Sequence, residues 1–163
     1  MKALSNPFAS LEGYNCFGCS PHNTAGLRMK FFEDGDEIVS EWTPQNGYQG
    51  YHNVLHGGVQ ATLMDEIASW VVYVKLTTAG FTSRADVRYR KTVYVDHGPV
   101  KLRARCTGMR RNLADIEVKL FDANGNLCTE GTFTYFTYSK EKAREHMFYP
   151  GLSAFFGNDE TRP

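Results

Sequence analysis

The sequence carries no excess of charge of either sign. Its 163 residues include 18 lysines and arginines and 18 aspartates and glutamates, which gives a formal net charge of +0 at pH 7. A chain without net positive charge has no global field that attracts the phosphate backbone of nucleic acid. We therefore expect no nucleic-acid partner.

Long hydrophobic runs are also missing. No stretch approaches the length needed to cross a bilayer, and residues 1–14 lack the charged start and apolar core of an export signal. This predicts a cytoplasmic protein without a membrane partner. Because internal repeats, low-complexity tracts and linkers are absent, we expect a single domain over residues 1–163, with an N-terminal segment 1–26 and a C-terminal extension 139–163.

Cysteine is scarce, and without an export signal the four thiols are expected to be reduced. Cys16 and Cys19 form one CxxC pair with His22 nearby, whereas Cys106 and Cys128 lie far away in strand-like runs. Zinc binding requires four ligands at suitable spacing, and a second ligand pair is missing. We therefore expect a tight turn at the CxxC pair and no metal site.

The longest regular pattern runs from Val59 to Leu76, where neither proline nor glycine occurs. Apolar residues recur there at helical spacing, namely Leu63, Ile67, Trp70 and Val74. The opposite face is also mostly apolar or small, so the helix is expected to be surrounded by protein. Asp65 lies on that face. Since a buried carboxylate requires hydrogen bonds or access to a ligand cavity, Asp65 is a candidate functional residue.

His56, Gly57 and Gly58 stand immediately before this helix. A helix N-terminus exposes unpaired N–H groups and the positive end of the helix dipole, and glycines let a ligand approach the backbone. Gly57 and Gly58 could therefore polarise a substrate carbonyl. At about 1.5 Å of rise per residue, Gly57 and Asp65 are separated by roughly 12 Å. If both act on one carbon, Asp65 must come from a second chain, which predicts a homodimer with paired composite sites.

After the helix, the hydrophobic period changes from 3.6 to two. The expected strands are 27–32, 37–42, 85–90, 101–106, 115–120 and 127–138. Residues 33–36 (EDGD) give a hairpin signal between the first two, and short links favour antiparallel pairing. We predict an α+β fold in which a curved antiparallel sheet of about six strands wraps around one long central helix.

This order of elements, with residues 48–59 (YQGYHNVLHGGV) leading to Asp65-Glu66, resembles the hotdog-fold acyl-CoA thioesterases of the PaaI type. Residues 16–19 (CFGC), followed by Asn23 and Gly26-Leu27, are similar to the N-terminal segment of many members. The resemblance covers residues 15–138. It implies a hotdog fold and hydrolysis of acyl-CoA to a free acid and coenzyme A at sites shared between two subunits. It also implies no cofactor, since coenzyme A enters as part of the substrate.

The resemblance also implies roles for individual residues. The glycine after the motif histidine donates its N–H to the thioester carbonyl, which assigns this role to Gly57 with help from Gly58. The helix acid, here Asp65, serves as nucleophile or as general base toward water. His56 would shape the turn or contact the substrate.

Two positions depart from the family pattern. Relatives often carry an asparagine six residues before the motif histidine, where this chain has Gly50, and Gln49 or Asn53 is expected to substitute. Several relatives use a serine in the first strand after the helix to position water. Thr82 is the favoured equivalent here, and Ser83 is the alternative.

Coenzyme A carries phosphates, which require cations near the mouth of the site. The candidates are Arg88, Arg90 and Lys91 in a strand-to-loop region and Arg110 and Arg111 in a later turn. A solvated strand face is the alternative interpretation of these residues.

The C-terminal extension departs from the strand pattern. Residues 140–146 are expected to form a short helix, and the aromatic rings that follow require cover. These rings are Phe148, Tyr149, Phe155 and Phe156. They could cap an acyl pocket, dock onto a second subunit or pack on the outer face of the sheet.

The favoured interpretation is a homo-oligomeric acyl-CoA thioesterase, either a homodimer or a homotetramer built as a dimer of dimers. The alternative is a catalytically silent hotdog domain that binds acyl-CoA as a sensor or interacts with a carrier. A hotdog hydratase or dehydratase is less favoured, because the chain lacks the paired Asp and His that such enzymes use for proton transfer from carbon. The sequence does not identify the acyl group.

Overall fold

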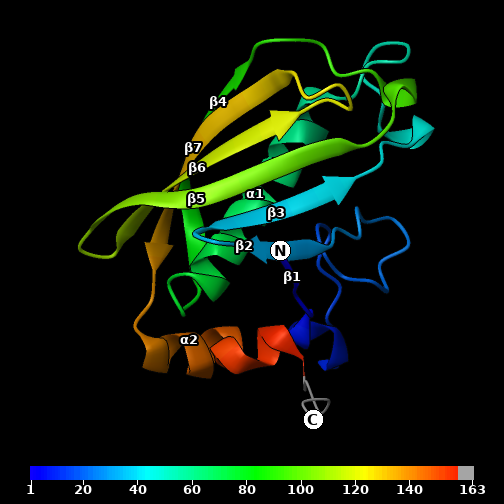
Figure 1. Cartoon of the computed structure of the whole chain (residues 1–163). Coiled ribbons are helices and arrows are strands. Elements are labelled where there is room, and N and C mark those ends of the chain that lie inside the picture. Colours follow the sequence, from blue (N-terminus) through cyan, green and yellow to red (C-terminus); the bar gives the residue numbers. More distant parts are fainter. Residues whose placement is uncertain (158–163) are drawn as a thin grey trace.

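The structure, a computed structural model, describes residues 1–157. Within them, one antiparallel sheet of seven strands curves around the long helix α1, Gly57–Val74 (Figure 1). The strands lie in the order β1-β2-β3-β5-β6-β7-β4, with the bounds Lys2–Ala3 (β1), Phe31–Asp34 (β2), Glu37–Trp42 (β3), Gly80–Tyr89 (β4), Val100–Arg110 (β5), Leu113–Phe121 (β6) and Leu127–Thr137 (β7). The remaining elements are α2, Lys140–Met147, and the 3₁₀ turns η1, Pro7–Ser10, η2, Asn46–Tyr48, η3, Val95–His97, and η4, Leu152–Phe156. The expected sheet around one long helix is confirmed, and the short β1 accounts for the additional strand.

Helix α1 is the centre of the hydrophobic core. It begins at Gly57, two residues before the expected start, because the His56 side chain caps its first turn. Leu63 and Ile67 are fully buried, and the helix packs against β3, β4, β5, β6 and β7. Its expected burial is therefore confirmed. Among the described residues, no helix combines the length and apolar character that a membrane crossing needs.

Strand β2 begins at Phe31, later than expected. The Leu27 N–H donates to the Phe17 carbonyl at 2.7 Å, and the Met29 N–H donates to the Gly18 carbonyl at 2.9 Å. Arg28 between them has a φ of 51°, which is incompatible with a continuous strand. The N–H groups of Leu27 and Met29 therefore bond to the N-terminal segment, and within the described chain residues 27–29 pair with no strand of the sheet.

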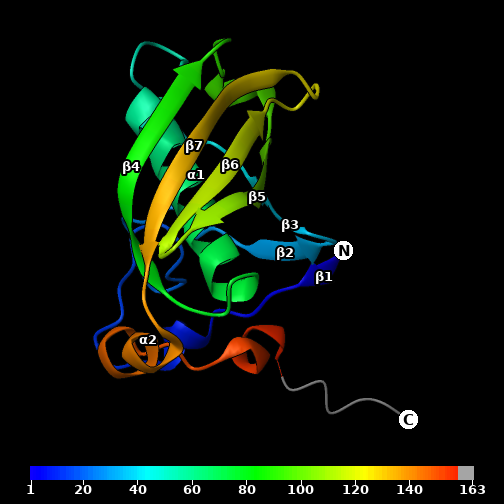
Figure 2. The same ribbon diagram turned by 90° about the vertical axis from the view of Figure 1, so that its left-hand side faces the viewer.

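Strand β4 forms one edge of the sheet (Figure 2). The alternating pattern predicts that Ala85, Val87 and Tyr89 face the core, but Ala85 is exposed, Val87 is half-buried and Tyr89 is 52% exposed. Within residues 1–157, β4 pairs with β7 alone, so its other edge is left without a neighbouring strand. A ten-residue edge strand is a surface on which another strand can pair.

The described part of the C-terminal extension, residues 139–157, closes the end of α1 that is remote from Gly57. The expected short helix is present as α2, and Phe155 is fully buried. Its ring lies 5.5 Å from the Trp70 ring, 5.7 Å from the Tyr73 ring and 5.8 Å from the Phe8 ring, measured between centroids. Phe155 thus packs against α1 and the N-terminal segment, which is a different place from the outer face of the sheet.

Candidate active site

The first turn of α1 is held by the His56 side chain. Its Nδ1 accepts the Gly58 N–H at 2.9 Å, and the His56 carbonyl accepts the Gln60 N–H at 3.1 Å. The Gly58 N–H is thus used by the cap in this structure, and its expected help to Gly57 stays a prediction. Within residues 1–157, the Gly57 N–H donates to no protein acceptor. The Gly57 N–H therefore remains free for a substrate.

A shallow hollow of about 320 Å³ lies beside Gly57 and includes Arg90 and Lys91 in its lining. Tyr89, at the end of β4, also lines it and donates its hydroxyl to the Gly57 carbonyl at 2.8 Å. This contact ties the helix N-terminus to the edge strand. The sequence did not identify Tyr89 as a site residue, because residues 85–90 show only the alternating pattern of an ordinary strand.

Asp65 is partly buried in α1, and two hydroxyl groups fix its carboxylate. Oδ1 accepts the Thr82 hydroxyl at 2.6 Å and the Tyr135 hydroxyl at 2.8 Å. Within the described part of the chain, Oδ2 accepts no hydrogen bond. The alternative residue Ser83 donates to the Thr134 carbonyl at 2.9 Å, so Thr82 is the one that reaches Asp65.

Strand register explains why these groups meet. Thr82 in β4 and Tyr135 in β7 are directly opposite in the antiparallel pair, so their side chains lie on the same face. That face is turned toward α1, and the register shift immediately after Thr82 redirects the strand. Burial, followed by the nearby Asp65 charge, raises the pKa of Tyr135 far above its usual value. Tyr135 therefore stays a protonated donor.

Tyr135 is a second residue of this site, after Tyr89, that sequence reasoning missed. It is only 3% exposed, as expected of an inward position in a strand, and nothing in its own run separates it from an ordinary core residue. What identifies Tyr135 as a site residue is the pairing of β4 with β7, two strands that are far apart in the chain.

One chain does not bring Gly57 and Asp65 together. Both lie on the same straight helix, where about 1.5 Å of rise per residue places them roughly 12 Å apart. Asp65 is also absent from the lining of the hollow beside Gly57. The geometry within the chain thus agrees with the spacing inferred from the sequence.

Gln49 and Asn53 are engaged in loop contacts. The Gln49 Oε1 accepts the Asn53 N–H at 2.5 Å, and its amide donates to Asn46 Oδ1 at 3.1 Å. The Asn53 amide donates to Asp96 Oδ1 at 2.7 Å. The structure therefore gives both side chains a role in fastening the loop before α1. A Cβ at Gly50 would lie 3.3 Å from the His56 ring, so this glycine lets the ring approach closely.

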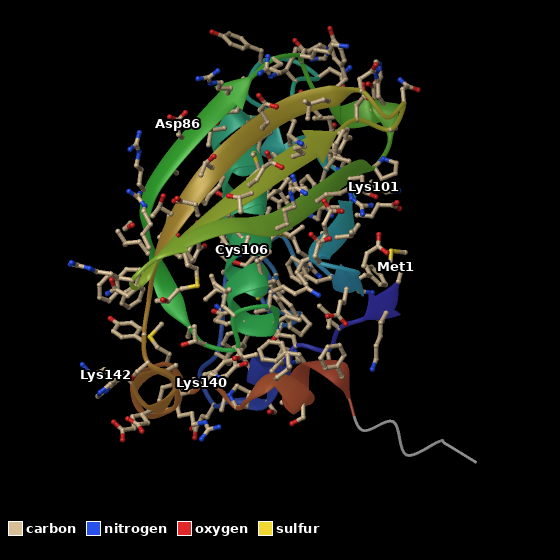
Figure 3. All side chains as sticks on the ribbon, turned by 60° about the vertical axis from the view of Figure 1, so that its left-hand side comes forward. Met1, Asp86, Lys101, Cys106, Lys140 and Lys142 are labelled. Carbon is tan, nitrogen blue, oxygen red and sulfur yellow. The ribbon has the colours of Figure 1, made fainter. Side chains whose placement is uncertain are left out.

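The five predicted cations do not form one cluster within the chain. Arg90 and Lys91 border the hollow beside Gly57, and Arg90 also pairs with Glu130. Arg88 and Arg110 line a different hollow together with Asp86. Figure 3 shows Asp86 on β4. Arg111 lies in the β5–β6 turn, at the opposite end of the sheet from the end of β4. Within one chain, strand direction therefore separates these cations, and their role as phosphate contacts stays a prediction.

Another group of titratable side chains surrounds Glu66, the neighbour of Asp65. Its Oε2 accepts from the Cys16 thiol at 3.5 Å, and Cys19 lies beside Cys16. Burial raises the pKa of Glu66 to about 8, while a hydrogen bond from Cys19 lowers the pKa of Cys16 to about 5. Glu66 was not considered a ligand in the sequence, since it lies 50 residues after Cys16.

Comparison with known proteins adds to this geometry. Residues 52–129 match the family model of the thioesterase superfamily. No curated protein matches the chain. A solved thioesterase superfamily protein is 21% identical with a TM-score of 0.67, over 73% of this chain and 58% of that protein, so this chain spans less than two thirds of its length.

Two further solved structures are similar over most of their own length. A hypothetical thioesterase from Streptococcus pneumoniae TIGR4, solved with coenzyme A, is 24% identical with a TM-score of 0.63, over 68% of this chain and 86% of that one. A Streptococcus mutans UA159 protein bound to acetyl-CoA is 18% identical with a TM-score of 0.64, over 80% of this chain and 98% of that one. The chain thus has the hotdog fold, and its residues 52–129, which contain Gly57 and Asp65, match the thioesterase superfamily.

Proposed function

We propose that this protein hydrolyses acyl-CoA thioesters to a free acid and coenzyme A, as an enzyme of the PaaI type. The observation that carries the proposal is the Asp65 carboxylate, whose Oδ1 is held by Thr82 and Tyr135 while Oδ2 is left for a reactant. A carboxylate held in this way is positioned for proton transfer or attack. The family match and the coenzyme A and acetyl-CoA seen in similar structures support the substrate class.

The active site is proposed to be shared between two chains. Gly57 and Asp65 of one chain are too far apart to act on one carbon, so Gly57 of one chain acts with Asp65 of another. The open edge of β4 offers a route to this assembly, because antiparallel pairing of two copies of β4 would continue the sheet across a two-fold axis. Pairing of two such dimers would give the tetramer.

The Gly57 N–H polarises the thioester carbonyl. As the carbonyl carbon becomes tetrahedral, negative charge gathers on its oxygen, and a donor already aimed at that position needs no rearrangement. The positive end of the α1 dipole acts in the same direction. Removal of one such donor costs about 100- to 1,000-fold in kcat in comparable enzymes.

Asp65 supplies the second half of the reaction. As general base it takes a proton from water while the water oxygen bonds to the carbonyl carbon; the C–S bond then breaks, and the proton passes to the coenzyme A sulfur. As nucleophile it bonds to the carbonyl carbon, the C–S bond breaks and coenzyme A leaves as a thiolate that takes up a proton from water; a second water then hydrolyses the anhydride to the free acid and restores the Asp65 carboxylate. Thr82 and Tyr135 hold the carboxylate in either route. The Streptococcus pneumoniae protein has been solved with aspartate-to-alanine and threonine-to-alanine substitutions, the residue types that meet here.

Arg90 and Lys91 are the proposed phosphate contacts from the chain that supplies Gly57, because they border the same hollow. Arg88, Arg110 and Arg111 would have to contribute from elsewhere in the assembly. The reaction needs no cofactor, and its placement in the cytoplasm remains a prediction from the sequence.

The proposal is tested by following thiol release from acetyl-, hexanoyl-, palmitoyl-, benzoyl- and phenylacetyl-CoA. Asp65→Asn keeps the size of the side chain and should lower kcat by about 100- to 10,000-fold. Asp36→Asn changes an exposed acid in the β2–β3 turn and should behave as wild type. A wild type that binds acyl-CoA tightly but turns over none of the panel would favour the sensor.

A further inference from the structure

We propose that Cys16, Cys19 and Glu66 form a binding site for a thiophilic divalent cation, with zinc as the preferred ion. Their ligand atoms, two sulfurs and one carboxylate oxygen, all lie within 4.8 Å of one another. The sequence offers only the CxxC pair, and the fold supplies the third ligand from α1. The proposal does not depend on the catalytic function.

The distances between the ligand atoms suit tetrahedral coordination. The Cys16 and Cys19 sulfurs are 3.5 Å apart, and the Cys16 sulfur is 3.5 Å from Glu66 Oε2. Zinc bonds of about 2.3 Å to sulfur and about 2.0 Å to oxygen require edges of about 3.8 Å between sulfurs and about 3.5 Å between sulfur and oxygen. A small movement of one thiol would therefore admit the ion.

Contacts of the surrounding chain hold the three ligands in place. The Cys19 N–H points to the Cys16 sulfur at 3.4 Å, which closes the CxxC turn. A Cβ at Gly18 would collide with the Glu66 side chain, so this glycine lets the turn lie directly against Glu66 on α1. The Gly18 carbonyl accepts the Met29 N–H at 2.9 Å, which anchors the turn to the following segment.

The surroundings of the site favour a cation. Glu66 receives only the Trp70 indole N–H at 3.3 Å and the Cys16 thiol, and within residues 1–157 it forms no ion pair. An enclosed carboxylate without a cationic partner is costly, and two thiolates beside it would add to that cost. A divalent ion would compensate most of this charge and make all three groups ligands.

Groups behind the ligands would orient the Cys19 sulfur. The Tyr14 hydroxyl lies 2.9 Å from that sulfur, and the Asn6 amide donates to it at 3.5 Å. Donors in this position hold a thiolate toward its metal. A hollow of about 500 Å³ is lined in part by Cys19 and Trp70, so it borders the proposed site at Cys19, the side from which an ion and a solvent molecule as fourth ligand would enter.

A bound ion would fasten the N-terminal segment to α1 at the residue that follows Asp65. It would act on the structure and take no part in thioester chemistry. Chelation should therefore lower the melting temperature, as expected when a ligand that binds only the folded state is removed.

The test is metal content and cobalt substitution in the reduced full-length protein. Wild type should hold about one zinc per chain, and Co²⁺ in its place should give a sulfur-to-cobalt charge-transfer band. Cys16→Ser and Glu66→Gln should each weaken zinc binding by at least about 100-fold, since even residues behind metal ligands contribute up to that factor. The control Cys106→Ser alters a thiol on β5 (Figure 3) and should bind as wild type.

Circular dichroism of each variant separates loss of metal from loss of fold. If Cys16→Ser does not fold, the effect of a chelator on the wild-type melting temperature decides the matter. The proposal is overturned if the reduced, folded wild type takes up neither zinc nor cobalt, or if the sulfur band persists in Cys16→Ser. It is equally overturned if Cys106→Ser removes the band while the protein remains folded.

Discussion

Replacing Tyr135 by phenylalanine isolates the hydroxyl that holds Asp65. The substitution keeps the buried ring and removes a donor that lies 2.8 Å from both Asp65 Oδ1 and the Asp65 carbonyl oxygen. A hydrogen bond to a charged group contributes about 1.5–3 kcal/mol, and the lower value applies because two acceptors share one hydrogen. At about 1.4 kcal/mol per tenfold change in rate, kcat should fall by about 10-fold.

The assay measures kcat and KM on the acyl-CoA that wild type hydrolyses fastest. KM should change little, because Tyr135 acts through Asp65 and does not contact the substrate. Tyr138→Phe is the matched control, since within residues 1–157 its hydroxyl makes no hydrogen bond while its ring packs against Phe81 and Phe136. A folded Tyr135→Phe enzyme with wild-type kcat would refute the assigned role.

Three further substitutions test other parts of the account. Thr82→Ala should lower kcat by about 10-fold through the loss of its hydrogen bond to Asp65, and Thr82→Ser should restore it; equal kinetics for the two variants would contradict this. Arg90→Ala should raise KM for acyl-CoA more than it lowers kcat, and unchanged steady-state kinetics would remove Arg90 from the binding site. Leu63→Ala should lower the free energy of unfolding in urea by about 2–5 kcal/mol, because Leu63 is 0% exposed; a loss within about 0.5 kcal/mol, the usual effect of a surface change, would place it outside the core.

Elements with an uninterrupted period are the ones that could be predicted from the sequence. The helical repeat located α1 to within two residues, and alternation gave β3 its observed bounds, Glu37–Trp42. The prediction of β2 was wrong at Leu27 because long-range bonds to Phe17 and Gly18 outweigh the local pattern. The alternating pattern wrongly predicted that Ala85 faces the core. Ala85 is exposed because β4 is an edge strand, and which strand lies at the edge depends on the topology of the whole sheet.

For the candidate site, the sequence supplied the residues that lie within one short stretch. Gly57 and Asp65 stand out because glycine and an acid are unusual at the start and in the buried part of a helix. Tyr135 and Glu66 could not be found in this way. Their importance depends on which side chains the sheet register and the CxxC turn place beside them. The hydrogen bond from Gly58 to His56 likewise depends on the geometry of the helix cap.

The central claim is that Gly57 of one chain acts with Asp65 of another. Gly57→Pro removes the N–H in question and adds a Cβ that, as in Gly57→Ala, would lie 3.4 Å from the Tyr89 ring. The helix start should be kept, because proline is favoured at the first helical position and His56, with a ψ of 133°, already has the conformation that precedes proline. Asp65→Asn removes the acid. Each variant alone should be nearly inactive, whereas Gly57→Ala keeps the N–H and should lose less activity than Gly57→Pro.

The decisive measurement is thioesterase activity of mixed dimers, in which Gly57→Pro and Asp65→Asn chains carry different affinity tags and are purified over both. Each mixed dimer contains one site with an intact glycine and an intact acid, so it should recover about half of the wild-type activity. A mixed dimer as inactive as its two parents would contradict the shared site, because it would show that each chain needs both residues for itself.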